Sequence, residues 1–305
     1  MRRYVLKRIL LGIIAVIGVS IIVFILARLS GDVALLLAPN TATEEDIQNI
    51  RAQYGLDKSV VEQYGIFAVN AVRGDLGKSI QYNLPVTELI AQKIPATLEL
   101  AGLAFLVSIC TGVFIGVISA TRRDSLIDWL GRIFAMLGQS MPGFWVGIML
   151  ILVFGVMLKW LPTSGRGEFS QLIMPAFALG WFSMASIMRI TRSAMLDVMD
   201  SEYIKLARIK GNPERIVIWK HALKNAMIPV IGVAGLQLTF AIGGAVIIES
   251  VFRWPGMGSL IIQAVVTRDY PVIQGGVLVL SMVFIAVNLI VDVMAGVIDP
   301  RVRFD

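Results

Sequence analysis

The sequence predicts an all-α membrane protein with six transmembrane helices in one domain of residues 1–305. Hydrophobic residues make up 57% of the chain and charged residues only 16%, whereas a soluble domain carries about a quarter charged residues. The apolar residues are also gathered into long runs, each near the ~20 residues that a helix needs to cross the core of a bilayer. The composition and the clustering of apolar residues together predict that this chain lies in a lipid bilayer.

Six apolar runs are predicted to span the membrane. They cover residues 9–27, 95–120, 133–158, 173–190, 226–248 and 272–298. Arg2, Arg3, Lys7 and Arg8 precede the first run, as they would in a signal peptide. That run is too long for the apolar part of a signal peptide and lacks a small-x-small cleavage site, so we interpret it as a retained span.

The distribution of positive charge predicts that both termini are cytoplasmic. Lys and Arg concentrate in the N-terminal segment, the Arg122–Arg123 turn, the loop 191–225 and the C-terminal tail, which share one side if there are six spans. Cytoplasmic loops carry this excess, so the long loop 29–94 is expected outside. Because the net charge of +6 resides in these loops, we expect no nucleic-acid partner.

Few residues offer enzymatic or metal chemistry. Cys110 and His221 are the single cysteine and the single histidine of the sequence. They exclude a disulfide framework and argue against a His/Cys metal cage. The sequence also contains no Gly-x4-Gly-Lys-Ser/Thr loop, the motif that cradles nucleotide phosphates. We therefore predict no catalytic residue, cofactor or metal in this chain.

The loop 191–225 is polar but carries the signals of two short helices. Asp200 or Ser201 can cap the first helix, and Gly211 can end it in a left-handed conformation. Asn212 is then predicted to cap a second helix that has Pro213 at its first position.

Both short helices are amphipathic by spacing. The first has one face made of Tyr203, Leu206, Ala207 and Lys210, and the second has one made of Ile216, Trp219 and Leu223. Such a pair suits a groove on a soluble partner. It could equally lie on the lipid surface, and the residues alone leave both readings open.

Residues 203–229 resemble the EAA loop of ABC importer permeases, most closely the version of the dipeptide, oligopeptide and nickel group. Ala207 and Gly211 stand at the third Ala and the Gly of that pattern, while Lys205 stands at its Glu. Further matches follow in order at residues 74–79, 95–100, 252–258 and 268–271. Ser30-Gly-Asp-Val departs from the common Pro-Gly-Asp-Pro.

The resemblance implies a type I ABC importer permease in a bacterial plasma (inner) membrane. Such a subunit forms half of the path for di- or oligopeptides; nickel chelates, glutathione and oligosaccharides are the alternatives. Its implied partners are a homologous second permease, two cytoplasmic ATPase subunits that bind ATP and Mg, and an external solute-binding protein. The residues implied to couple ATP hydrolysis to transport are Tyr203, Leu206, Ala207, Lys210, Gly211, Pro213, Trp219 and His221.

Several polar residues lie in or near the predicted spans, where such groups are costly and face protein or water. They are Glu99, Gln139, Gln237, Asn288 and Asp292. They could line the transport path or hydrogen-bond between helices. Pro142 and Gly143, within the third run, predict either a hinge or a static kink. Glu249 and Arg253 mark the end of the fifth run.

The sequence disfavours two other functional classes. An intramembrane enzyme would need paired acids, a Ser/His pair or a metal cluster, and the single cytoplasmic His221 argues against it. A secondary carrier would show internal repeats and acidic sites at mid-membrane, and the sequence shows neither.

The outer loop is expected to contain an ordered helix that touches the binding protein. At residues 43–54 a capping Thr43 precedes three acidic residues, which suit the positive end of a helix dipole. Ile47, Ile50 and Tyr54 then recur at helical spacing.

Overall fold

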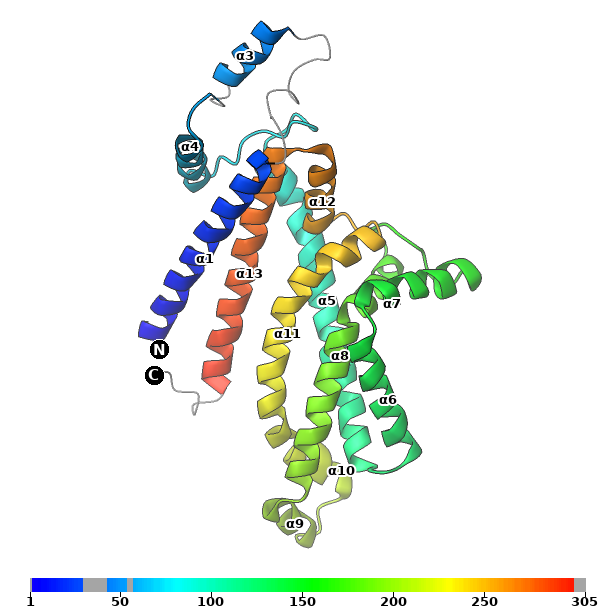
Figure 1. The fold of residues 1–305 in the computed structure, drawn as a ribbon. Helices are drawn as coiled ribbons and strands as arrows, with labels where there is room; N and C mark the ends of the chain where they lie inside the picture. The colour runs from blue at the N-terminus through cyan, green and yellow to red at the C-terminus, as the bar shows by residue number, and fades with distance from the viewer. Residues whose placement is uncertain (1, 30–42, 54–56, 299–305) are drawn as a thin grey trace. The chain divides into compact units, whose positions relative to one another are not determined.

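The computed structural model describes residues 2–29, 43–53 and 57–298 (Figure 1). Within these residues it contains helices and no named strand, with one isolated bridge between Lys78 and Pro85. The chain forms two compact units. Unit 1 comprises residues 1–96 and 255–286, and unit 2 comprises residues 97–254 and 287–305.

Five helical stretches of the described chain are long and apolar enough to cross a membrane. Four of them are the helices α1 (Arg2–Leu29), α5 (Val86–Thr121), α8 (Phe169–Met199) and α13 (Tyr270–Ile298). The remaining stretch, Glu214–Val251, consists of α10 (Glu214–Ile216), the π-helix η2 (Val217–Ala222) and α11 (Leu223–Val251). These results confirm the predicted all-α membrane fold.

The third predicted span, 133–158, is broken. α6 (Leu126–Ser140) and the pair formed by α7 (Gly143–Leu150) and the π-helix η1 (Ile151–Met157) meet at an angle of 109°. Pro142 has no N–H to donate, and a proline disfavours helical backbone in the residue before it. Met141 is accordingly extended, with φ −94° and ψ 124°. The kink predicted at Pro142 and Gly143 is present, and it is much sharper than a bend within one span.

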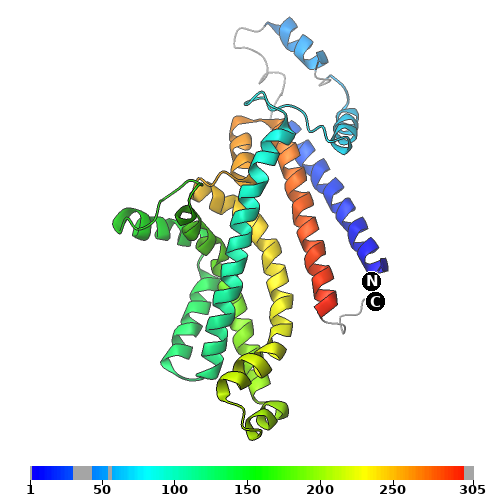
Figure 2. The same cartoon turned by 180° about the vertical axis from the view of Figure 1, so that it is seen from behind.

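Other predicted boundaries need correction as well. α5 begins at Val86 rather than at residue 95, so the connection after α1 is shorter than the predicted loop 29–94 (Figure 2). α8 extends the predicted span 173–190 at both ends. The boundaries were predicted from the ends of the apolar runs alone. Helical propensity and packing extend both helices beyond those ends. Residues 30–42 and 54–56 of the predicted outer loop lie outside the described residues.

α8 is the central helix of unit 2, and small residues allow its neighbours to approach closely. A Cβ added to Gly112 or Gly116 of α5 would lie 2.9 or 2.7 Å from side-chain carbons of Ile187 or Thr191 of α8. On α6, Gly131 likewise faces Met188. The glycines of α5 and α6 therefore set how closely both helices contact α8.

Unit 1 has its own apolar core, formed by α5, α12 (Met257–Thr267) and α13. Val86, Leu89, Leu260 and Val272 are among its buried residues. Next to it, the buried carboxylate of Asp269 accepts a hydrogen bond from the Ser79 hydroxyl and bonds from the backbone N–H groups of residues 80 and 81, at 3.2 and 3.1 Å. This carboxylate ties the segment before α5 to the start of α13.

The predicted outer helix is confirmed as α3 (Glu44–Gln53). The Thr43 backbone N–H and hydroxyl donate to the Asp46 carboxylate at 2.9 and 2.8 Å. These bonds hold the pKa of Asp46 below its usual value. Ile47 is buried, whereas Tyr54 and the side chain of Ile50 lie outside the described residues. A second helix, α4 (Val60–Val72), was not predicted.

Candidate functional site

The turn that follows α9 (Glu202–Ile209) has the predicted backbone reversal. Gly211 has φ +77°, the left-handed conformation expected of it. Asn212 does not cap the next helix, because its side-chain amide donates instead to the Ala207 carbonyl at 2.9 Å, at the end of α9. Pro213 takes the N-cap position with ψ 142°.

An ion pair closes this turn. Arg208 donates to the Glu214 carboxylate at 3.2 Å from Nε and at 2.8 Å from Nη2. The hydrogen bond with Glu214 raises the pKa of Arg208. The bidentate geometry therefore fixes the end of α9 against the first turn of α10.

The predicted second short helix is not a separate element. Helix continues without a break from Glu214 to Val251, so the segment expected to stand apart is the beginning of the fifth span. Its middle, η2, has the wider turns of a π-helix, which occur often at functional sites. His221 is half-buried within it.

α9 leaves three of the four predicted face residues exposed but buries Ala207. Ala207 is only 8% exposed, and with the fully buried Ile204 it packs against Met195 and Val217 of the same chain. The exposed apolar residues are Tyr203, Leu206 and Ile209, at 39%, 56% and 79%. The helical spacing of these residues showed that they lie near one another on α9. It could not show that α9 folds back on α8 and so covers Ala207. Lys210 is exposed at the C-cap.

Two aromatic side chains of the segment from α9 to η2 contact other helices of unit 2. The Trp219 ring stacks on Phe114 of α5, with centroids 6.3 Å apart. The Tyr203 hydroxyl accepts a hydrogen bond from the Asn225 side chain at 2.7 Å. The segment around α9 is therefore held against α5 and α11 while an apolar strip of α9 stays open.

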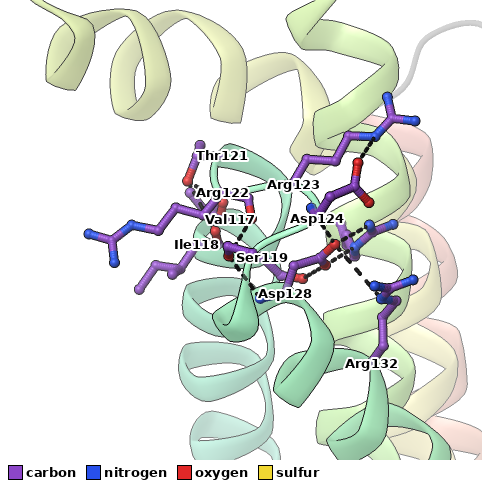
Figure 3. Close-up of polar contacts among 11 residues, drawn as sticks. Val117, Ile118, Ser119, Thr121, Arg122, Arg123, Asp124, Asp128 and Arg132 are labelled. Carbon is purple, nitrogen blue, oxygen red and sulfur yellow. Dashed lines mark hydrogen bonds and ion pairs between the residues drawn. The ribbon is translucent and has the colours of Figure 1, made fainter.

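A buried ion pair close to the α5–α6 turn was missed by the sequence analysis (Figure 3). The fully buried Asp128 carboxylate accepts bonds from Arg192 Nε and Nη2 at 2.7 and 2.8 Å, from the Ser119 hydroxyl, and from the Asp124 backbone N–H. Arg132 approaches to 3.8 Å. The one sequence signal was the spacing of Ser125 and Asp128, since Ser125 caps α6.

Most of the polar residues singled out in the spans have protein partners. Glu99 is paired with Arg166 at 2.6 Å, and Arg189 donates to Gln139 at 3.1 Å. The buried Gln237 of α11 accepts from Ser183 at 3.1 Å and donates to Ser186 at 3.3 Å, both on α8.

Two further residues complete that set. Asn288 and Asp292 are half-buried on α13. Glu249 is fully buried and accepts a hydrogen bond from Thr97 at 2.6 Å, which links the end of α11 to α5. Arg253, just beyond, is exposed with φ 49°.

The break between α6 and α7 borders a cavity of about 300 Å³ in unit 2. Its walls include Phe144, Phe182 and Phe240, and Ser183 and Gln237 supply its side-chain polar groups. The described lining residues include no Asp, Glu, Lys or Arg. An apolar cavity with a few polar groups is typical of a site for a small organic ligand. Among the described residues, no group of three His, Cys, Asp or Glu could hold a metal ion.

Comparison with known families identifies the chain. Residues 112–304 match the family described as binding-protein-dependent transport system inner membrane component, and residues 1–101 match the N-terminal part of such a membrane component. The chain belongs to this family. It is a multi-pass membrane permease of a bacterial ABC transport system, and it works in a complex with other subunits.

Named relatives match the permease along its whole length. It is 41% identical to the glutathione transport system permease protein GsiC of Escherichia coli O6:H1 over 306 residues, covering 100% of both chains. It is 38% identical to the dipeptide transport system permease protein DppB of Alkalihalophilus pseudofirmus over 333 residues, again covering 100% of both. These matches confirm the resemblance found in the sequence.

A solved structure shares the fold. A chain from the crystal structure of an amino acid ABC transporter with histidines superposes with a TM-score of 0.53 at 16% identity. The match covers 71% of the permease and 95% of that chain.

Proposed function

We propose that this permease forms half of a transmembrane path through which an ATP-driven importer takes up di- or oligopeptides. The observation that carries the proposal is the full-length similarity to permeases named for dipeptide and glutathione transport. An external solute-binding protein delivers the substrate, and a homologous second permease completes the path. Because Ser183 and Gln237 border an uncharged cavity near mid-span, they are candidates to contact a peptide amide in transit.

ATP and Mg bind in two partner ATPase subunits, since the sequence has no phosphate-binding loop of its own. We propose that these subunits dock on the exposed strip of Tyr203, Leu206 and Ile209 on α9. This strip is apolar on an otherwise charged helix, as a surface that a partner covers would be. Closure of the ATPases would then push on α9 and shift the spans between two states.

Substrate class is tested by reconstituting the four-subunit transporter with its binding protein in proteoliposomes. ATP-dependent uptake of a labelled dipeptide, competed by longer peptides, supports the proposal. Glutathione is the second candidate, favoured by the similarity to the Escherichia coli protein, and uptake of glutathione without dipeptide would select it. Uptake of a nickel chelate or an oligosaccharide alone would contradict peptide import.

We further propose that both termini and α9 face the cytoplasm of a bacterial inner membrane. The test uses single cysteines at Ser201 and Glu45 in a Cys110→Ala background. A membrane-impermeant thiol reagent should label position 45 from outside intact cells, and position 201 only after lysis. Labelling of both positions from the same side would overturn this topology.

A further inference from the structure

α4 carries its uncharged polar residues on the side that faces the rest of unit 1. Gln63 and Asn70, seven residues apart on one helix face, line a cavity of about 200 Å³ together with Arg28 and Asp75. The opposite face is apolar and open. It is formed by Val61, Gly65, Val69 and Val72, and the three valines are 81%, 51% and 91% exposed.

This arrangement is the reverse of that of a helix on a water-facing surface, which buries its apolar stripe and exposes its polar residues. Segments surrounded by lipid show this reversed pattern, because polar side chains there turn toward protein. The charged residues of α4 lie at its two ends, with exposed Arg73 at the C-cap. Ser59 caps the helix, and Lys58 pairs with Glu62 at 3.2 Å within the first turn.

The contacts of α4 with α1 fix its depth relative to that span. The Tyr64 hydroxyl lies 2.8 Å from the Ser20 hydroxyl, and the Phe24 ring lies 5.5 Å from Tyr64 and 6.0 Å from Phe67. α1 continues for nine residues beyond Ser20, to Leu29, which is about 14 Å of helix. α4 therefore lies beside the apolar part of α1 and not beyond its end (Figure 1).

We propose that α4 is an interfacial membrane helix whose valine face lies in the acyl region of the leaflet at the Leu29 end of α1. The exposed residues Ile17, Ile21 and Ile25 of α1 belong to the span on which α4 packs, so one lipid-facing surface would include both. A surface that binds a soluble protein reversibly has a polar rim around its apolar centre. Between the two ends of α4 the polar residues Gln63 and Asn70 face inward, toward Arg28 and Asp75, which favours lipid over the solute-binding protein.

The test measures which solvent surrounds the valine face. Val69→Cys and Val72→Cys, each in a Cys110→Ala background, are spin-labelled in the complete transporter, in vesicles of phosphatidylethanolamine and phosphatidylglycerol. Collision rates are measured with oxygen, which concentrates in lipid, and with a water-soluble nickel chelate. Glu62→Cys, in the first turn of the same helix, is the matched control.

A ratio of oxygen to nickel collisions severalfold higher at positions 69 and 72 than at position 62 is expected. Nickel collisions at the valine positions as frequent as at position 62 would overturn the proposal, because the face would then be in water. Low rates with both reagents would overturn it too, because a protein partner would then cover the face. Repeating the measurement with added binding protein should leave the two valine positions unchanged.

Discussion

The guanidinium of Arg192 makes two hydrogen bonds to the carboxylate of Asp128, at 2.7 and 2.8 Å, across 64 residues of sequence. The pair joins the first turn of α6 to α8, the central helix of unit 2. Asp128 is fully buried, while the Arg192 side chain keeps 20% of its surface exposed. The Ser119 hydroxyl adds a bond from α5, so three helices meet at one carboxylate.

Removing that carboxylate should destabilise the permease. Asp128→Ala leaves the Arg192 charge largely buried without its partner, which costs about 3–5 kcal/mol in buried pairs; the partial exposure of Arg192 favours the lower value. The measurement is the thermal unfolding midpoint in detergent. Asp124→Asn is the control, because its pair with Arg123 is exposed at 3.5 Å and such pairs contribute about 0–1 kcal/mol. Equal midpoints for both variants would contradict the assignment.

Charges placed on the two sides of α9 should have different effects. Leu206→Asp lies on the open strip, so it should leave the unfolding midpoint unchanged and reduce co-purification of the ATPase subunits. Ala207→Asp buries an unpaired carboxylate among Ile204 and Val217, so it should lower the midpoint itself. If α9 lay on lipid instead, Leu206→Asp would weaken membrane contact while ATPase association stayed at the wild-type level.

Gly211 should tolerate asparagine better than valine. No heavy atom lies within 4 Å of a Cβ added there, so the effect of substitution comes from the backbone at φ +77°. Left-handed backbone costs most residues about 1–2 kcal/mol, and asparagine less. Gly211→Val should therefore lower stability and ATPase association relative to Gly211→Asn. Indistinguishable variants would show that the turn can adopt another conformation.

Two glycines of α5 provide a test of close packing. A Cβ at Gly116 would lie 2.7 Å from the Thr191 Cβ and 2.8 Å from the Met188 carbonyl oxygen, whereas nothing lies within 4 Å at Gly102. Gly116→Ala should destabilise by about 1–3 kcal/mol through overpacking. Gly102→Ala should be neutral or stabilise by up to about 1 kcal/mol, since alanine favours helix. The difference is read from unfolding midpoints, and its absence would argue against this α5–α8 contact.

The role of Gln237 can be separated into packing and transport. Gln237→Leu removes its bonds to Ser183 and Ser186, and interhelical bonds in membranes contribute about 0.6 kcal/mol each. A purely structural role predicts a loss near 1 kcal/mol with normal uptake per folded transporter. A fall in uptake without a change in midpoint would instead assign Gln237 to the transport path.

Local sequence signals proved accurate where one residue determines the backbone. Pro142 predicted a kink, Gly211 a left-handed turn and Thr43 the start of a helix, and all three are present. In each case the cause lies in the residue's own dihedral preference or capping group. No tertiary contact was needed to foresee them.

Features that depend on tertiary contacts could not be predicted in this way. Spacing grouped Ala207 with Leu206, but only the fold of α9 onto α8 decides which of them is covered. The partners Asp128 and Arg192 are far apart in sequence, and nothing local pairs them. α4 was not predicted because its apolar run is too short for a span, and its pattern does not match that of a helix on a water-facing surface.

The unbroken helix from Glu214 to Val251 has a mechanical consequence. Its 38 residues make a rod of about 57 Å, so a tilt of about 10° at the Pro213 end displaces the other end by about 10 Å. The Arg208–Glu214 pair holds one end of this lever, and the bond between Thr97 and the buried Glu249 holds the other. The π-turns of η2 and the missing N–H of Pro229 are the places where this helix can flex, so they limit how much of the proposed push on α9 reaches Glu249.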